Sequence, residues 1–200
     1  MDEEHKEYSI QEIISGNRSE FAKLIDAHSN QIYRLAQKML NNPQDAEDVL
    51  QNTFLKAFQN INHFEGRSKI STWLYRIATN EALMIIRKQH PEVNISEEYG
   101  EEDNEINSPI QLIDWCCLPE SEMVSSESRK ELDNAIQRLS EALRIVFILR
   151  DIEGLSIQET SKILNLTETA VKTRLLRARL NLREQLSTYY GDRFLARSKE

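Results

Sequence analysis

A concentration of basic side chains near the C-terminus is the clearest sign of chemistry in this 200-residue sequence. The stretch LNLTETAVKTRLLRARLNLR, residues 164–183, holds five basic residues against a single acid, Glu168. Cations at this density on one helix either contact nucleic-acid phosphates or form an ordinary solvated face. The whole chain nevertheless carries a formal net charge of −8. The five basic residues are Lys172, Arg174, Arg177, Arg179 and Arg183.

The acidity belongs to one segment of the chain. Residues 92–133 contain thirteen acids against two basic residues, a net charge of −11 within the total of −8, which leaves the rest of the chain at +3. Residues 91–127 are also rich in Ser and Asn and lack hydrophobic periodicity, as is typical of a flexible linker. The basic helix is therefore expected in a separate, cationic domain.

The residues before the basic helix have the layout of a helix-turn-helix. Ser156 and Glu159 have the spacing of a capping box that begins a short helix. Asn165 suits a left-handed turn, and Thr167 can cap the helix that follows. The core-facing stripe predicted for this second helix is Val171, Leu175, Ala178 and Leu182.

The remaining faces of the second helix divide by chemistry. Two basic rows are expected along the borders of the stripe, one of them formed by Arg174 and Arg177. The face between the rows presents Thr169, Thr173, Leu176 and Leu180, the last of which alternatively contacts a protein partner. Such a helix suits the major groove of DNA, with the small side chains toward base edges and the cations toward phosphates.

Two helices expected in the N-terminal half carry further candidate surfaces. Asn42 and Pro43 begin a helix to about Asn60. The exposed Leu55 on its outer face, among acids and amides, is typical of a modest docking face, although single exposed leucines are common. The other residues of that face are Asp48, Gln51, Asn52 and Gln59.

The next helix, from a cap at Ser71 or Thr72 to about Lys88, combines aromatic, basic and amide groups. This is the set of side chains that holds an unpaired nucleic-acid strand. Alternatively, the tryptophan belongs to the core and the arginines are solvated. The residues of the helix face are Trp73, Arg76, Asn80 and Arg87, and the loop before it, which could read a flipped base, holds His63, Phe64, Arg67 and Lys69.

Gly and Pro are scarce, at five and four residues, and helix starts recur, so we expect an all-α fold. Its predicted parts are two small helical domains, residues 1–90 and 128–200, joined by the flexible acidic linker 91–127. Cys116 and Cys117 are expected to be reduced thiols. The sequence has no apolar run of membrane-spanning length and no signal peptide, so we expect a cytosolic protein.

Three stretches, in this order, resemble the extracytoplasmic-function sigma factors of bacterial RNA polymerase. DAEDVLQNTFLKAFQNI and FEGRSKISTWLYRIATNEAL resemble the region-two segments that dock on the core polymerase and recognise the minus-ten element. LSEALRIVFILRDIEGLSIQETSKILNLTETAVKTRLLRARLNLRE resembles region four, which binds the minus-thirty-five element. The sequence departs from the family at Met84, where an acid is usual.

The resemblance assigns roles by position. The residues implied to contact the core polymerase are Asp45, Asp48, Gln51 and Leu55. Those implied to engage minus-ten DNA are His63, Phe64, Arg67, Lys69, Ser71, Trp73, Arg76, Asn80 and Arg87. Those implied to bind the minus-thirty-five duplex are Thr167, Thr169, Lys172, Thr173, Arg174, Leu176, Arg177 and Arg179.

The partners implied by the resemblance are core RNA polymerase, promoter DNA and an anti-sigma factor. By the resemblance, the linker would pass through cationic channels of the polymerase, where its negative charge could act as an RNA mimic. Alternatively, the acidic run is simply disordered and solvated. We expect no catalytic activity, cofactor, metal site, membrane insertion or obligate homo-oligomer. A stand-alone helix-turn-helix regulator, which would bind a palindrome as a dimer, is the alternative. A nucleic-acid enzyme has no support, because the sequence lacks a Gly-rich phosphate loop and a paired nucleophile.

Overall fold

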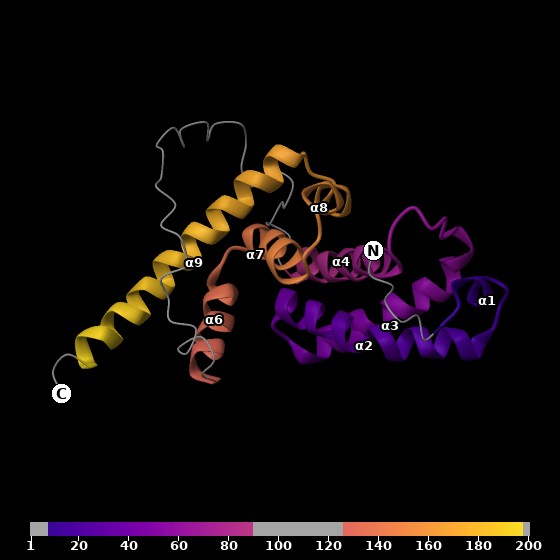
Figure 1. The fold of residues 1–200 in the computed structure, drawn as a ribbon, viewed down its shortest axis with the longest axis horizontal. Coiled ribbons are helices and arrows are strands. Elements are labelled where there is room, and N and C mark those ends of the chain that lie inside the picture. The colour runs from indigo at the N-terminus through magenta and orange to yellow at the C-terminus, as the bar shows by residue number, and fades with distance from the viewer. Residues whose placement is uncertain (1–7, 90–125, 198–200) are drawn as a thin grey trace. The chain divides into compact units, whose positions relative to one another are not determined.

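The computed structural model describes residues 8–89 and 126–197, which belong to two units, residues 1–92 and 93–200. Within the described ranges the secondary structure is helical and contains no strand (Figure 1). The prediction of an all-α fold is therefore confirmed. The acidic linker, including Cys116 and Cys117, lies outside the described residues, except that residues 126 and 127 form the start of a helix.

Three long helices, α2 (Arg18–Leu40), α3 (Pro43–Asn60) and α4 (Ile70–Gln89), form the core of the N-terminal unit. They pack against one another (Figure 1). Leu24, Leu35 and Leu74 are fully buried between them. The elements in chain order are α1 (Ile10–Ile14), α2 (Arg18–Leu40), α3 (Pro43–Asn60), the 3-10 turn η1 (Ile61–His63) and α4 (Ile70–Gln89).

Polar side chains begin the first three helices. The Asn42 side chain accepts hydrogen bonds from the amides of Gln44 and Asp45, which confirms the cap expected before α3. Ser9 caps α1, and its own amide donates to Glu20 of α2 at 2.7 Å. A hydrogen bond from Lys23, together with that from Ser9, holds the pKa of Glu20 below its usual value.

The start of α4 differs from the prediction. The Lys69 carbonyl already accepts a hydrogen bond from the Trp73 amide at 3.2 Å, so the helix begins at Ile70. Ser71 and Thr72 lie in its first turn and are not its caps. Ile70, the first residue of the helix, is buried. Its burial favours a helix start that the local capping pattern does not predict.

The C-terminal unit is built around one long helix. Three of the elements before that helix, α6, α7 and α8, pack against it (Figure 1). Val146, Val171 and Leu175 form a buried cluster within the unit. The elements are α6 (Ser126–Arg138), α7 (Glu141–Phe147), the π-helical turn η3 (Ile148–Ile152), α8 (Ile157–Leu164) and α9 (Glu168–Arg197).

Two features of this unit depart from the expected pattern. The helical pattern of residues 128–187, with expected interruptions at Gly154 and Asn165, predicts continuous helix up to Gly154, but a break at Ser140 separates α6 from α7. The last helix continues to Arg197, about ten residues beyond its expected end near Ser187. Residues 188–197 contain no proline, so each backbone amide there can donate to the helix.

Candidate nucleic-acid interface

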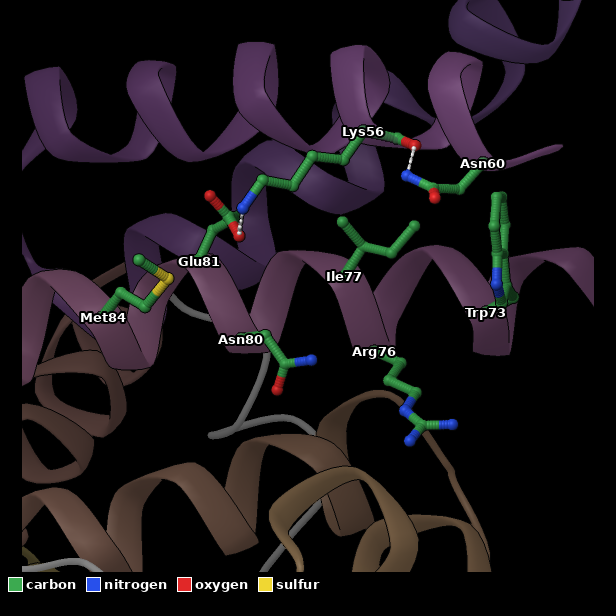
Figure 2. A pocket seen from close by; sticks show the side chains of 8 residues that line it. All are labelled: Lys56, Asn60, Trp73, Arg76, Ile77, Asn80, Glu81 and Met84. Atoms are coloured by element: carbon green, nitrogen blue, oxygen red, sulfur yellow. Dashed lines mark hydrogen bonds and ion pairs between the residues drawn. The ribbon is translucent and has the colours of Figure 1, made fainter. Parts of the chain in front are cut away.

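A pocket of about 410 Å³ lies on the α3–α4 face of the N-terminal unit. Figure 2 shows Lys56 extending from α3 to Glu81 of α4, while Arg76 and Asn80 extend from another side of α4. The lining of the pocket includes three of the predicted minus-ten residues, Trp73, Arg76 and Asn80. Helix α3 contributes Lys56 and Asn60 to the lining, and α4 contributes Trp73, Arg76, Ile77, Asn80, Glu81 and Met84.

Trp73 lies at the edge of the core, with part of its ring exposed. Its ring centroid is 5.4 Å from that of Phe64, in a tilted arrangement. Phe64 follows η1 and is itself half-buried, so the two rings support each other at one end of the pocket. A half-exposed indole held in this way is suited to stacking on a base. Trp73 is therefore only partly enclosed by the core, while Arg76 and Arg87 are exposed, as the alternative of solvated arginines also expects.

An ion pair inside the pocket was not predicted from the sequence. Lys56 Nζ lies 2.5 Å from Glu81 Oε1. The Glu81 side chain is 11% exposed and that of Lys56 is 44% exposed. The two residues are 25 positions apart and belong to different helices, so no helical spacing relates them. Only the packing of α3 on α4 reveals the pair.

The other predicted minus-ten residues are dispersed, and the pocket lining does not include them. Arg67 is exposed in the loop and forms an ion pair with Glu65 at 2.5 Å. Arg87 is exposed near the end of α4, and Ser71 is half-buried in its first turn. His63 and Lys69 are exposed at the two ends of the loop. These residues can reach a nucleic acid only beyond the pocket.

The outer face of α3 matches the expected docking surface in three of four residues. Asp48 and Gln51 are exposed, and Leu55 retains 55% of its exposure. Asp45 is half-buried, and its Oδ2 accepts a hydrogen bond from Gln89 Nε2 at 2.9 Å, so it links α3 to the end of α4.

Phe58 is a residue of this face that the sequence interpretation missed. It is 47% exposed and lies three positions after Leu55. Its ring centroid is 5.1 Å from that of Phe21 of α2, in an edge-on arrangement. The spacing of three residues from Leu55 was the available signal, because such residues share a helix face.

The helix-turn-helix predictions hold in the C-terminal unit. Ser156 and Glu159 form a reciprocal capping box at the start of α8. Asn165 adopts the left-handed conformation, with φ of 54°, and turns the chain toward α9. The Thr167 hydroxyl accepts a hydrogen bond from the Ala170 amide at 3.1 Å, as expected of a cap. The four residues predicted to face the core, Val171, Leu175, Ala178 and Leu182, are all buried.

The placement of Arg174 on an accessible border of α9 is wrong. Its side chain is 3% exposed, whereas Arg177 is half-buried. Arg144 of α7 is also buried, and its Nη1 donates to the carbonyl and side-chain oxygens of Gln137, both at 3.1 Å. Burial lowers the pKa of Arg144. This unit therefore encloses two of its arginines, and a count of its basic residues overstates the charge at its surface.

Arg179 is exposed but is held by an acid from another element. Its Nε and Nη2 donate to the two carboxylate oxygens of Asp151 in η3, at 2.8 and 2.7 Å. These hydrogen bonds raise the pKa of Arg179. A guanidinium has five N–H donors, so others stay available on the 51%-exposed Arg179 side chain. The pair with Asp151 therefore orients the Arg179 side chain on the surface of α9.

The face of α9 that is expected to present Thr169, Thr173 and Leu176 to base edges is only partly exposed. Thr169 and Lys172 are exposed, while Thr173 and Leu176 are half-buried. Small and basic side chains close together on one helix are the arrangement that fits the DNA major groove.

Comparison with known proteins identifies both units. Residues 24–92 match the family Sigma-70 region 2, and residues 129–182 match the family Sigma-70, region 4. Two helical units of these kinds in one chain define a sigma factor of RNA polymerase.

The relatives narrow the class. The chain is 38% identical over 177 residues to the ECF RNA polymerase sigma factor SigW of Bacillus subtilis (strain 168), which covers 88% of this chain and 94% of the relative. It is 31% identical over 173 residues to the ECF RNA polymerase sigma-E factor of Haemophilus influenzae, covering 85% and 89%. The chain therefore belongs to the extracytoplasmic-function sigma factors, which direct RNA polymerase to promoters, and the predicted function is confirmed.

Solved structures share this fold. CnrH, in complex with the cytosolic domain of CnrY, has a TM-score of 0.61 and 23% identity, covering 90% of this chain and 95% of that chain. The sigma factor RpoE of Bartonella quintana, in complex with the anti-sigma factor NepR, has a TM-score of 0.62 and 26% identity, covering 84% and 96%.

The described residues hold neither a membrane-spanning helix nor a cluster of metal-binding side chains. Across residues 8–89 and 126–197, no helix has the length and apolar character to cross a membrane. In the same ranges, no group of three His, Cys, Asp or Glu side chains could hold a metal ion.

Proposed function

We propose that the two units divide promoter recognition between them. The N-terminal unit, residues 1–90, would dock on the core polymerase and hold the melted minus-ten strand, and residues 128–200 would bind the minus-thirty-five duplex. The linker 91–127 would connect the two. The observation that carries this division is the difference in chemistry between the α3–α4 pocket, lined by Trp73 and amides, and the outer face of α9, where threonines lie between basic side chains.

The pocket supports a role in binding unpaired DNA. Trp73 offers a partly exposed ring, and Asn80 and Arg76 offer hydrogen-bond donors beside it. A base leaves its stack at a cost, which stacking on an aromatic side chain offsets. Phe64 supports Trp73 from behind, and His63, Arg67, Lys69, Ser71 and Arg87 would contact the strand on either side of the pocket.

The outer face of α9 supports a role in reading duplex DNA. Thr169, Thr173 and Leu176 would face base edges, and Lys172, Arg177 and Arg179 would contact phosphates on the two sides of the groove. Thr167 would contribute mainly as the helix cap. Arg174 is not part of this proposal, because its side chain is buried.

The exposed face of α3 would bind the core polymerase through Asp48, Gln51 and Leu55. Asp45 would support this face through its hydrogen bond to Gln89. Replacing the exposed Leu55 by Asp should weaken holoenzyme formation by roughly tenfold or more, because burying a charge in an apolar contact is unfavourable. Gel filtration with core polymerase measures the change, and Asn30→Asp, at an exposed position of α2 outside this face, is a control for added charge.

Further properties follow from membership of the family. The solved relatives CnrH and RpoE are each bound to another protein, an anti-sigma factor in the case of RpoE. We extend this to an anti-sigma factor for the present chain. The protein would act in the cytoplasm, where RNA polymerase transcribes, and would have no catalytic activity of its own.

Run-off transcription tests the proposal. Purified core polymerase, incubated with genomic fragments, should initiate at specific promoters only when the full chain is added. The chain alone should bind the same fragments weakly, since each unit makes few phosphate contacts. Tight and specific duplex binding without polymerase, or dimers on a palindrome in sedimentation, would instead favour a stand-alone regulator.

A further inference from the structure

The ion pair in the α3–α4 pocket is asymmetric. The Glu81 carboxylate is largely enclosed, at 11% side-chain exposure, whereas the Lys56 side chain keeps 44%. A buried carboxylate is stable when it is paired, and the ammonium of Lys56 supplies its partner. The acid is therefore the anchor of the pair, and the lysine is its accessible end.

The anchored ammonium retains binding capacity. A lysine ammonium carries three donors, and Glu81 Oε1 takes one of them. A free lysine loses rotamer entropy when a ligand orders it. Because Glu81 already orders Lys56, a second acceptor binds at a smaller entropic cost.

The surroundings of the pair indicate which acceptor it meets. Trp73 also lines the pocket and can stack on an unpaired base, whereas Asn80 extends from another side of α4 (Figure 2). The volume of about 410 Å³ is within the range of pockets that hold small ligands. A strand whose base stacks on Trp73 carries phosphate groups beside that base, and a lysine binds phosphate as a point charge.

We infer that Glu81 is a positioning residue that holds Lys56 as a phosphate contact for the melted minus-ten strand. The inference rests on the proposed function of the pocket. It adds a contact from α3 to a surface otherwise assigned to α4 and the loop before it. It also gives the buried Glu81 a role on a surface that binds an anion.

The test uses holoenzyme reconstituted from the full chain and a promoter fragment whose minus-ten region is single-stranded. The variant Lys56→Met/Glu81→Leu removes both charges, so the net charge of the unit is unchanged and no buried carboxylate is left unpaired. We expect its affinity for the fragment to fall roughly tenfold. The slope of log affinity against log salt concentration should become shallower by about 0.7, the contribution of one phosphate of a single strand.

A matched control removes an ion pair elsewhere. Arg138 and Glu131 of α6 form a 3.3 Å pair in the C-terminal unit, and Arg138→Met/Glu131→Leu should leave affinity for the single-stranded fragment unchanged. Thermal unfolding of both double variants establishes that they fold. Lys56→Arg should restore most of the affinity, since a guanidinium can bind the carboxylate and a phosphate together.

Neutral phosphate substitutes locate the contact. Methylphosphonate is introduced at one position of the strand at a time. At one of these positions it should weaken binding by the native protein. At the same position it should not change the affinity of the Lys56→Met/Glu81→Leu variant. If Lys56 instead contacts a base, the native protein and the double variant will differ in their response to a base substitution and not in their response to methylphosphonate. That result would overturn the phosphate inference.

The role of Glu81 is tested by coupling. Removing Lys56 should cost less affinity in a Glu81→Leu background than in the native protein, whereas strictly additive losses would overturn the positioning role. Unchanged affinity and salt dependence in the double variant would overturn the contact itself. Trp73→Ala separates the two proposals: if it also has no effect, the minus-ten assignment of the pocket fails, and if it weakens binding, only the Lys56 inference fails.

Discussion

The α3–α4 pocket and the outer face of α9 solve different recognition problems with similar residues. The pocket is concave and combines an aromatic ring, amides and one ion pair. Helix α9 carries threonines between basic side chains on its outer face. An unpaired base needs a surface to replace its lost stacking, whereas a duplex keeps its bases stacked and shows only their edges.

The two surfaces also hold their cations differently. Lys56 is anchored by an acid that is 11% exposed, whereas Arg179 is anchored by Asp151, which is 22% exposed and binds through both carboxylate oxygens. Each acid comes from a different element than its cation. In both units, therefore, tertiary packing orients a basic side chain toward the surface. The comparison leads to four predictions.

The largest expected effect distinguishes a buried arginine of α9 from an accessible one. Arg174→Ala should lower the free energy of unfolding of the C-terminal unit by about 2–4 kcal/mol, because it removes a side chain that is 3% exposed. Urea unfolding followed by circular dichroism measures this loss. Arg177→Ala, the matched control on the same helix, should cost less than half as much. Equal losses for the two variants would contradict the distinction.

The second prediction concerns the pocket. Trp73→Ala should weaken binding of the holoenzyme to a pre-melted promoter by about 1–3 kcal/mol, the usual contribution of stacking on one base. Binding to an isolated minus-thirty-five duplex should be unaffected. Fluorescence anisotropy with both fragments measures the two affinities. A loss of equal size on the duplex would show that Trp73 supports the fold and does not bind a base.

The third prediction separates two kinds of contact on α9. Arg177→Ala should weaken all promoters to a similar degree and reduce the salt slope by about 0.9, the contribution of one duplex phosphate. Thr173→Ala should alter which promoters are preferred and leave the salt slope unchanged. Transcription from a library of minus-thirty-five variants measures the preference. If Arg177→Ala and Thr173→Ala shifted the promoter preference in the same way, the assignment of Arg177 to phosphates and Thr173 to bases would be contradicted.

The smallest effect concerns the Asp151–Arg179 pair. A double-mutant cycle with Asp151→Ala and Arg179→Ala should give a coupling energy of about 0.5–1 kcal/mol in unfolding, because the pair is bidentate but partly exposed. The coupling should shrink as salt is added. Glu153→Ala removes an acid from the same turn and should show no coupling to Arg179. Absence of coupling for Asp151 would mean that the pair does not order Arg179.

Most of the helices, and the caps at Asn42, Ser156 and Thr167, could be predicted from the sequence. The start of α4, the break at Ser140 and the end of α9 could not. The capping box at Ser156, the left-handed turn at Asn165 and the cap at Asn42 involve residues within a few positions of one another. The buried stripe of α9 follows from the helical repeat alone. Such features are local, and the chain specifies them wherever the segment folds.

Tertiary structure alone decided which polar side chains meet. The burial of Arg174, the link from Asp45 to Gln89 and the pair of Lys56 with Glu81 each depend on how one helix packs against another. Helical periodicity places a residue on a face of its own helix, but it does not say what covers that face. The sequence by itself therefore determined that this chain is a two-part sigma factor with cationic surfaces. The packing of its helices decided which of those cations are enclosed, which are anchored and which remain accessible to DNA.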